Sequence, residues 1–350
     1  MPRLGRAYLT RTGNNGAGAA FRGGVHPGWP THAGPPPTAR RLFVRLRQFG
    51  ALLLLGAIWG SAYLLIALAL GSFRPAVLVA VRLVIAAAFL LAALHACGLR
   101  LPTRPGTWGA LLLAAVIGID APFLLIAWGQ QAISSGMAGI LTSTTPLFTL
   151  PIAALWARAE RPRAPQVAGV ALGFVGVLVA IGVWGLRPDG VATRAYLAVL
   201  GASLCYAVVG VYGRHAFRGL PTLVPATGQV LCAALTMAPV ALLVDGLPSA
   251  RPSAEAIGAV LALAIPGTAG GYILFYWLLE RTGATRTSMV TYIIAPLALV
   301  FGALFLAEPL APHVILGLAL VIGGIALANG VVGQRPAGPA VAPPLAAADD

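Results

Sequence analysis

Long apolar blocks, separated by short polar breaks, fill most of this 350-residue chain. Each block holds about 20 residues, enough for a helix to cross a bilayer core of roughly 30 Å. The blocks are continuous and do not alternate between apolar and polar positions, so they favour helices over a membrane barrel. We therefore predict an all-α integral membrane protein. Its ten transmembrane helices are expected over 50–72, 75–97, 106–128, 132–155, 164–184, 193–213, 221–244, 255–279, 285–306 and 312–332.

Two stretches of the chain, 136–182 and 288–330, resemble each other. In each, an apolar run leads from a proline to an acidic residue and then to a Gly-rich helix. The shared positions are Pro146, Glu160 and Gly169 in the first copy and Pro296, Glu308 and Gly317 in the second. An internal repeat of this kind decides the architecture. We predict two halves of five helices, 49–185 and 192–332. Because five is odd, the second half enters from the opposite side, which gives an inverted repeat.

The two acidic residues of the repeat lie where a helix has just ended. We interpret Glu160 and Glu308 as capping or loop-anchoring residues at the start of the next helix.

The net charge of +14 comes from arginine alone, because the chain contains no lysine. With the N-terminus inside, fourteen arginines near span ends lie on the cytoplasmic side and four on the outer side. This bias predicts a multi-pass protein of the plasma (inner) membrane with both termini cytoplasmic. Residues 1–48 and 333–350, rich in Gly, Pro, Arg or Ala, are expected to be disordered tails. We read the basic tail as a topology signal, with the lipid bilayer and not nucleic acid as its partner.

Several residues now resemble the EamA-type families of the drug/metabolite transporter superfamily. They are the run Trp59-Gly60-Ser61, Arg82 in the second span, and the twice-occurring Pro…Glu…Gly pattern. The resemblance covers roughly residues 50–332. It implies a secondary transporter with a central cavity, often an exporter of amino acids, other metabolites or drugs that works by alternating access.

Spans three and eight carry matching breaks. When Trp128 is aligned with Trp277, no gap is needed in the ten residues before them. The helix-weakening residues of this region are Gly118 and Pro122 in span three and Pro266, Gly267 and Gly271 in span eight. Corresponding breaks in two halves point to a transporter's binding site, although close helix packing would also use such residues.

Asp120 lies within the first break, and Arg82 lies at a similar depth in the span before it. A carboxylate deep in a span costs at least about 2.5 kcal/mol, so it needs a partner, a proton or water. Three interpretations stay open: a structural Arg82–Asp120 ion pair, a proton- or substrate-binding Asp120, and an Asp120 exposed to solvent through a shallower span. Protons are therefore a candidate coupling ion.

Aromatic residues concentrate near the same depth: Trp59, Tyr63, Tyr206, Tyr272 and Tyr276. Together with Arg82 and Asp120 they form our predicted substrate-binding set. An aromatic wall beside one carboxylate favours an amphipathic small molecule that carries an amine. The hydroxyl residues around Ser143 and Thr145 are expected to bond back to their own helix.

Other functions find less support. The spans hold no catalytic or metal-binding cluster, so we expect no enzyme activity, no metal and no cofactor. A membrane receptor or scaffold is the alternative, and a cavity beside Asp120 and Tyr272 would separate the two classes. The Gly-rich fifth and tenth spans allow a monomer or a homodimer, with internal packing as the default.

Reporter fusions test the topology. We expect fusions after Arg47 and after Gly333 to report the cytoplasm, because the arginine bias is large and ten is an even number. Opposite locations of the two ends would show that the span count is wrong by an odd number.

Overall fold

A computed structural model describes residues 37–157, 163–185, 190–217, 220–246, 251–282 and 287–329. Contacts divide the chain into residues 1–44, of which 37–44 are helical, and residues 45–350. The arrangement below concerns residues 45–350. Glu160 and most of the two predicted tails, 1–36 and 330–350, lie outside the described residues.

The described residues are almost entirely helical. In chain order the α-helices are α1 (Pro37–Leu70), α2 (Pro75–Ala96), α3 (Pro105–Ala115), α4 (Ala121–Gly129), α5 (Ser135–Thr142), α6 (Thr145–Ala157), α7 (Ala164–Ile181), α8 (Val191–Ala216), α9 (Leu223–Val244), α10 (Ala254–Ala262), α11 (Gly271–Thr282), α13 (Thr291–Leu306) and α14 (Pro312–Ala328). Short non-α segments are η1 (Val116–Asp120), η2 (Val183–Gly185), η3 (Leu263–Gly270) and η4 (Ser288–Val290).

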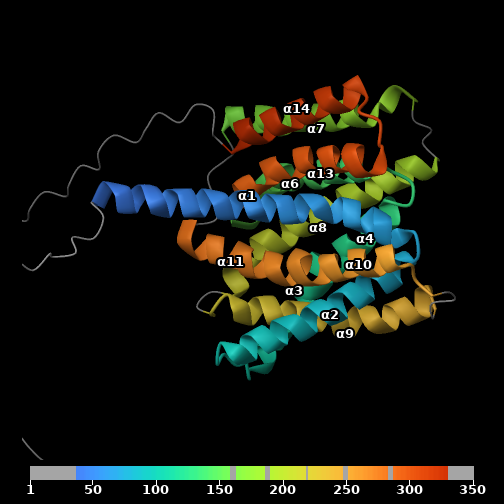
Figure 1. Cartoon of the computed structure of the whole chain (residues 1–350). Helices are drawn as coiled ribbons and strands as arrows, with labels where there is room; N and C mark the ends of the chain where they lie inside the picture. Colours follow the sequence, from blue (N-terminus) through green and yellow to red (C-terminus); the bar gives the residue numbers. More distant parts are fainter. Residues whose placement is uncertain are drawn as a thin grey trace, which may run out of the picture. The chain divides into compact units, whose positions relative to one another are not determined.

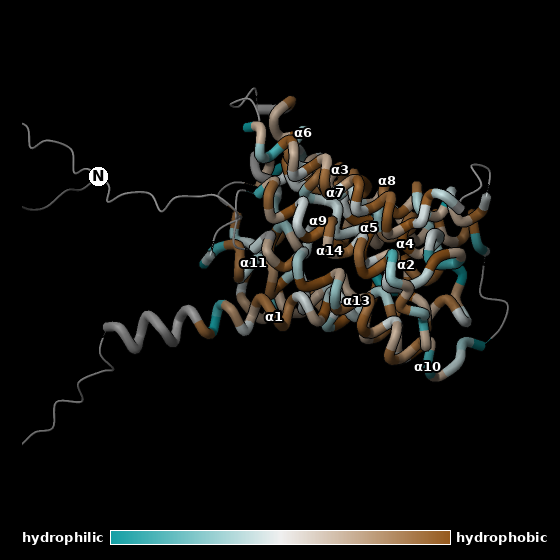
Figure 2. Tube along the Cα trace, turned by 90° about the horizontal axis from the view of Figure 1, so that it is seen from above, coloured by the Kyte–Doolittle hydropathy of each residue, from teal (hydrophilic) through white to brown (hydrophobic). Residues whose placement is uncertain are grey.

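Eight helical segments of the described residues are long and apolar enough to cross a membrane. Two shorter apolar helices, α13 and α14, lie where the ninth and tenth spans are predicted. Hydrophobic residues dominate along the helices, and hydrophilic ones gather toward the helix ends (Figure 2). The chain is therefore an all-α, multi-pass membrane protein. The structure differs from the predicted tail 1–48 at one point, because α1 already begins at Pro37.

Spans three and eight each contain a π-helical segment. In span three η1 separates α3 from α4, and in span eight η3 separates α10 from α11. Both segments fall on the aligned Gly/Pro positions. Glycine, and proline without its N–H, weaken the α-helical hydrogen-bond ladder, and π-turns are often found at functional sites. A π-turn also changes which helix face the neighbouring side chains occupy.

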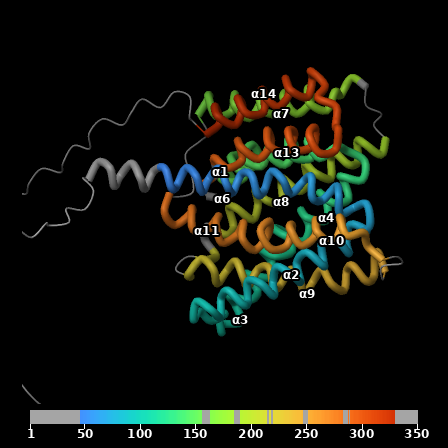
Figure 3. The backbone as a smooth tube through the Cα atoms, in the orientation of Figure 1, coloured from blue at the N-terminus to red at the C-terminus, as the bar shows by residue number. Residues whose placement is uncertain are grey.

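Elements from the two halves of the sequence pack in pairs. α2 packs against α9, α5 against α13, and α7 against α14. The α7–α14 pair lies along one edge of residues 45–350, and α2 and α9 lie together toward the opposite edge (Figures 1 and 3). α8 contacts α4, α5 and α6 near the centre.

The glycines of the fifth and tenth spans serve internal packing, the default interpretation. A Cβ added at Gly324 would lie 2.6 Å from the backbone oxygen of Gly169. A Cβ at Gly176 would lie 2.9 Å from the backbone oxygen of Gly317. These faces of α7 and α14 are therefore occupied within one chain. The Gly56–Gly60 pair is likewise used internally, against Ile293 and Leu297 of α13.

Two carboxylates cap helix N-termini across the halves. Glu308 accepts hydrogen bonds from the backbone N–H groups of Ser135 at 2.6 Å and Gly136 at 3.0 Å, at the start of α5. Asp245, just after α9, accepts from the backbone N–H groups of Ala76 at 2.7 Å and Val77 at 3.1 Å, at the start of α2. Charge-assisted bonds to these otherwise unpaired donors tie helix ends together. Glu308 is thus a capping residue, as predicted, but the helix it caps is α5 of the other half and not the next helix along the chain, α14.

Adjacent glycines of α14 offer a matched test of the α7–α14 contact. We expect Gly324→Ala to destabilise the protein by about 1–3 kcal/mol, because the new methyl group meets backbone atoms that cannot move aside. Gly323→Ala is the control. Its Cβ would meet only Leu172 Cδ2, at 3.9 Å, and alanine favours the helix. Thermal unfolding in detergent measures both, and equal midpoints for the two variants would contradict the packing account.

Candidate functional site

A cavity of about 760 Å³ lies among the central helices. This volume is within the range of small-molecule sites. Residues of α1, α2, α6, α8, α9, α11 and α13 line it. At one end it reaches the helix termini, where Phe217, Thr222 and Asn329 line it. At the other end it stops at Arg82, Ile126 and Ile66, within the helices.

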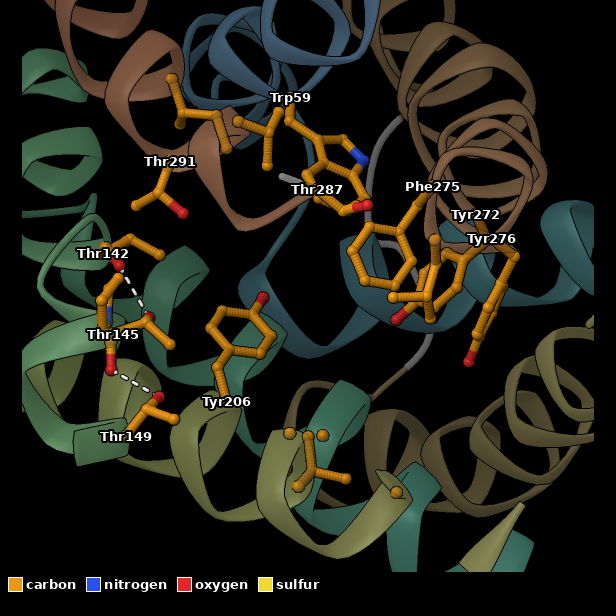
Figure 4. A pocket seen from close by; sticks show the side chains of 18 of the residues that line it. Trp59, Thr142, Thr145, Thr149, Tyr206, Tyr272, Phe275, Tyr276, Thr287 and Thr291 are labelled. Carbon is orange, nitrogen blue, oxygen red and sulfur yellow. Dashed lines mark hydrogen bonds between the residues drawn. The ribbon is translucent and has the colours of Figure 1, made fainter. Parts of the chain in front are cut away.

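Aromatic rings form one wall of the cavity. Trp59 lies 5.5 Å from Phe275, and Phe275 lies 5.4 Å from Tyr276, between ring centroids. Tyr272 stacks near Tyr276 at 6.2 Å. These rings gather on one side in Figure 4, with Tyr206 beside them. The wall can bind an apolar or aromatic group and favours no particular hydrogen-bonding pattern.

The π-helical segment η3 holds Trp59 in this wall. The indole Nε1 donates a hydrogen bond to the backbone oxygen of Gly267 at 3.2 Å. Gly271 packs so closely on the indole that a Cβ there would collide with the ring. The break in span eight therefore positions a side chain of α1, because a glycine allows the close approach.

Threonines form the opposite side. Thr142, Thr145 and Thr149 follow one another along α5 and α6 (Figure 4). Thr145 Oγ1 donates to the Thr142 carbonyl at 2.8 Å, and Thr149 Oγ1 donates to the Thr145 carbonyl at 2.9 Å. Ser143 also bonds back, to the Ile140 carbonyl at 2.6 Å. The expected back-bonding is thus confirmed for Ser143 and Thr145. The hydroxyl oxygens keep acceptor capacity toward the cavity.

Arg82 lies at the closed end and is only 7% exposed. Its Nε donates to Thr268 Oγ1 at 2.8 Å, and its guanidinium carbon lies 4.0 Å from the centre of the Phe123 ring. Thr268 in turn donates to the Leu263 carbonyl, five residues earlier, at 2.8 Å. This spacing follows the π-helical turn of η3, so the break in span eight also orients Arg82.

The structure brings together most of the predicted set. The predicted residues that line the cavity are Trp59, Tyr63, Arg82, Gly118, Tyr206, Gly267, Tyr272 and Tyr276. Four others, Asp120, Pro122, Pro266 and Gly271, are not among its lining residues. Gly271 acts indirectly, through Trp59.

Asp120 needs a correction. Its Oδ2 accepts a hydrogen bond from Thr236 Oγ1 of α9 at 2.5 Å, while Arg82 bonds to Thr268. Both side chains are among the described residues, and no ion pair joins them. The prediction rested on equal depth in neighbouring spans, which says nothing about the direction in which each side chain points. Asp120 is therefore bonded to α9 and is not among the residues that line the cavity.

Some residues that line the cavity or position its lining escaped the sequence analysis. Thr268 and Phe123 fix Arg82, and Gln229 of α9 lines the cavity next to Tyr276. Thr268 lies inside the predicted break, so its position was a usable signal. Gln229 is a polar residue in an otherwise apolar span, which is the other signal available.

The chain is similar to known proteins. A model of the EamA-like transporter family matches residues 48–182 and 193–330. The uncharacterized inner membrane transporter YedA of Escherichia coli K12 is 29% identical over 313 residues, covering 86% of this chain and 97% of that protein. A probable terminal-alkyne amino-acid exporter of Streptantibioticus cattleyicolor is 31% identical, covering 80% of this chain and 92% of that protein.

A solved crystal structure with 24% sequence identity gives a TM-score of 0.60 and covers 81% of this chain and 95% of its own. That likeness concerns the fold alone. The two family matches span most of the described helices, including every span that lines the cavity. The chain belongs to the EamA-like transporter family.

Proposed function

We propose that the protein is a secondary active transporter that exports small amphipathic metabolites through the cavity by alternating access. The observation that carries the proposal is a cavity closed at one end and reaching helix termini at the other. A channel would need a continuous path, whereas this cavity stops within the helices at Arg82, Ile126 and Ile66, which are all buried.

The packing pairs support an inverted repeat of ten spans. α2 with α9, α5 with α13 and α7 with α14 each join a span of the first half to its counterpart in the second. Packing of a span against its own counterpart is expected when a twofold axis relates the two halves. Inverted repeats underlie alternating access in many transporters, because the two halves can exchange conformations.

The predicted orientation assigns the cavity an inward opening. Its open end is lined near the C-terminal ends of α8 and α14, on the side where α11 also ends. With the N-terminus in the cytoplasm, this is the cytoplasmic side. The opposite end carries the caps made by Glu308 and Asp245. Loading from the cytoplasm suits an exporter.

The names of two relatives guide the proposal for the membrane and the substrate class. One is named an amino-acid exporter and another an inner membrane transporter, so we place this protein in the inner membrane with amino-acid-like substrates. Proton coupling is part of the proposal, with Asp120 as the buried carboxylate available to it. The transporting unit is a monomer or a homodimer.

Counterflow in proteoliposomes tests the function. We expect vesicles preloaded with a panel of amino acids and related compounds to accumulate at least one labelled member. An inward or outward pH gradient should change its rate, and Asp120→Asn should remove that response. Absence of exchange for every compound, with intact folded protein, would favour the receptor or scaffold alternative.

The aromatic wall gives a second test. Tyr272→Ala should raise the Kd of an exchanged compound by about 10-fold or more, since truncating a buried aromatic anchor typically costs over 1 kcal/mol. Tyr272→Phe keeps the ring and loses only the hydroxyl, so it should raise the Kd by much less than Tyr272→Ala does. Calorimetric titration of the purified protein measures both. Equal affinities of all three proteins would remove Tyr272 from the site.

A further inference from the structure

Arg82 is a buried cation that forms no ion pair with any residue that the structure describes. Among the described residues that line the cavity it is the one with a permanent charge, and neither Asp nor Glu accompanies it. Its partners among the described residues are the Thr268 hydroxyl and the Phe123 ring, and both are neutral. Burying a charge costs free energy unless an opposite charge pairs with it, and this cost is higher in the core of the bilayer. The positive charge of Arg82 is therefore not compensated by the residues of the cavity.

The guanidinium is fixed and presents a free edge. The bond to Thr268 uses Nε, and Phe123 covers one face. The buried polar atoms left without a partner are Asp120 Oδ1, Gln130 Oε1 and Ser135 Oγ, and the terminal Arg82 nitrogens are not among them. Because these nitrogens have no hydrogen-bond partner among the described residues, they must be accessible from the cavity. A paired edge of two N–H donors matches a carboxylate.

The surroundings select the kind of anion. A phosphate dianion would require more positive charge than one guanidinium supplies. The walls next to Arg82 are Tyr63, Tyr272 and Tyr206, whose hydroxyls lie within electrostatic reach of it. Phenolic O–H groups can donate to the same anion. Beyond them lie the rings of Trp59 and Phe275, which suit an apolar body.

We propose that the closed end of the cavity is a carboxylate site, in which the Arg82 fork binds the carboxylate of an amphipathic substrate and the aromatic wall binds its apolar body. This inference rests on the proposed function and names its substrate class. In place of Asp120, which is not among the lining residues, Arg82 becomes the charged residue that binds the substrate, through its carboxylate.

The test compares carboxylates with the corresponding carboxamides, in which the carboxylate charge is removed, on the purified full-length protein. The pairs are 3-phenylpropionate and 3-phenylpropionamide, hexanoate and hexanamide, and L-phenylalanine and L-phenylalaninamide. Calorimetric titration should show at least one carboxylate binding about 10-fold more tightly than its amide. If no carboxylate exceeds its amide, or if none binds, the site is overturned.

Variants then assign the preference to one residue. In Arg82→Gln the carboxylate should lose its preference and bind only as well as the amide does. Arg82→Lys keeps the charge but loses the planar fork, and should keep only part of the preference. A full preference in Arg82→Gln would overturn the assignment. Should that variant fail to fold, the wild-type comparison alone still decides whether the site selects carboxylates.

Failure of this inference is distinguishable from failure of the transport function. Exchange of neutral or cationic compounds but not of carboxylates would overturn the carboxylate site and leave transport intact. Binding that depends on Arg82, without exchange of any compound, would support the site and overturn transport.

Discussion

The absence of water from the bilayer core is the constraint on which this structure depends. Every backbone N–H and C=O at that depth must be paired within the protein. Regular helices satisfy most of them, and side chains must satisfy the rest at helix ends. Glu308 and Asp245 do so at the N-termini of α5 and α2. Each carboxylate comes from the second half and each capped helix from the first, so pairing the backbone also joins the halves.

The same constraint explains how irregular backbone is used. The π-helical segments η1 and η3 occur in corresponding spans, and both lie against the cavity through Gly118 and Gly267. Irregular backbone in a membrane is tolerated where it lines a cavity or is buried in protein. In η3 the irregularity serves the site directly. It offers the Gly267 carbonyl to Trp59 and the Thr268 hydroxyl to Arg82.

The sequence predicted how deep in the membrane a residue lies, but it did not predict the direction in which its side chain points. Apolar runs located the helices, and aligned Gly and Pro residues located the two π-helical segments. Aromatic residues near that depth, such as Tyr272 and Trp59, line the cavity. Depth alone could not say which face Asp120 occupies. A π-turn adds a residue to the helical turn, so the direction of a side chain beside it cannot be obtained from a 3.6-residue period. For the same reason the sequence did not predict the contact between Arg82 and Thr268, which are 186 positions apart.

The two halves share a packing scheme but not a charge pattern. α2 carries Arg82, whereas its counterpart α9 has no charged residue. The candidate site is therefore asymmetric, with its cation in the first half, its fixing hydroxyl, Thr268, in the second, and three of the four wall rings, all but Trp59, also in the second. A substrate held between them contacts both halves. Alternating access requires the halves to move relative to each other, and the Arg82–Thr268 bond crosses between them. A ligand carboxylate on the free edge of Arg82 would compensate the charge whether or not that bond persists. Charge compensation by the substrate would thereby lower the cost of the movement that carries the substrate across.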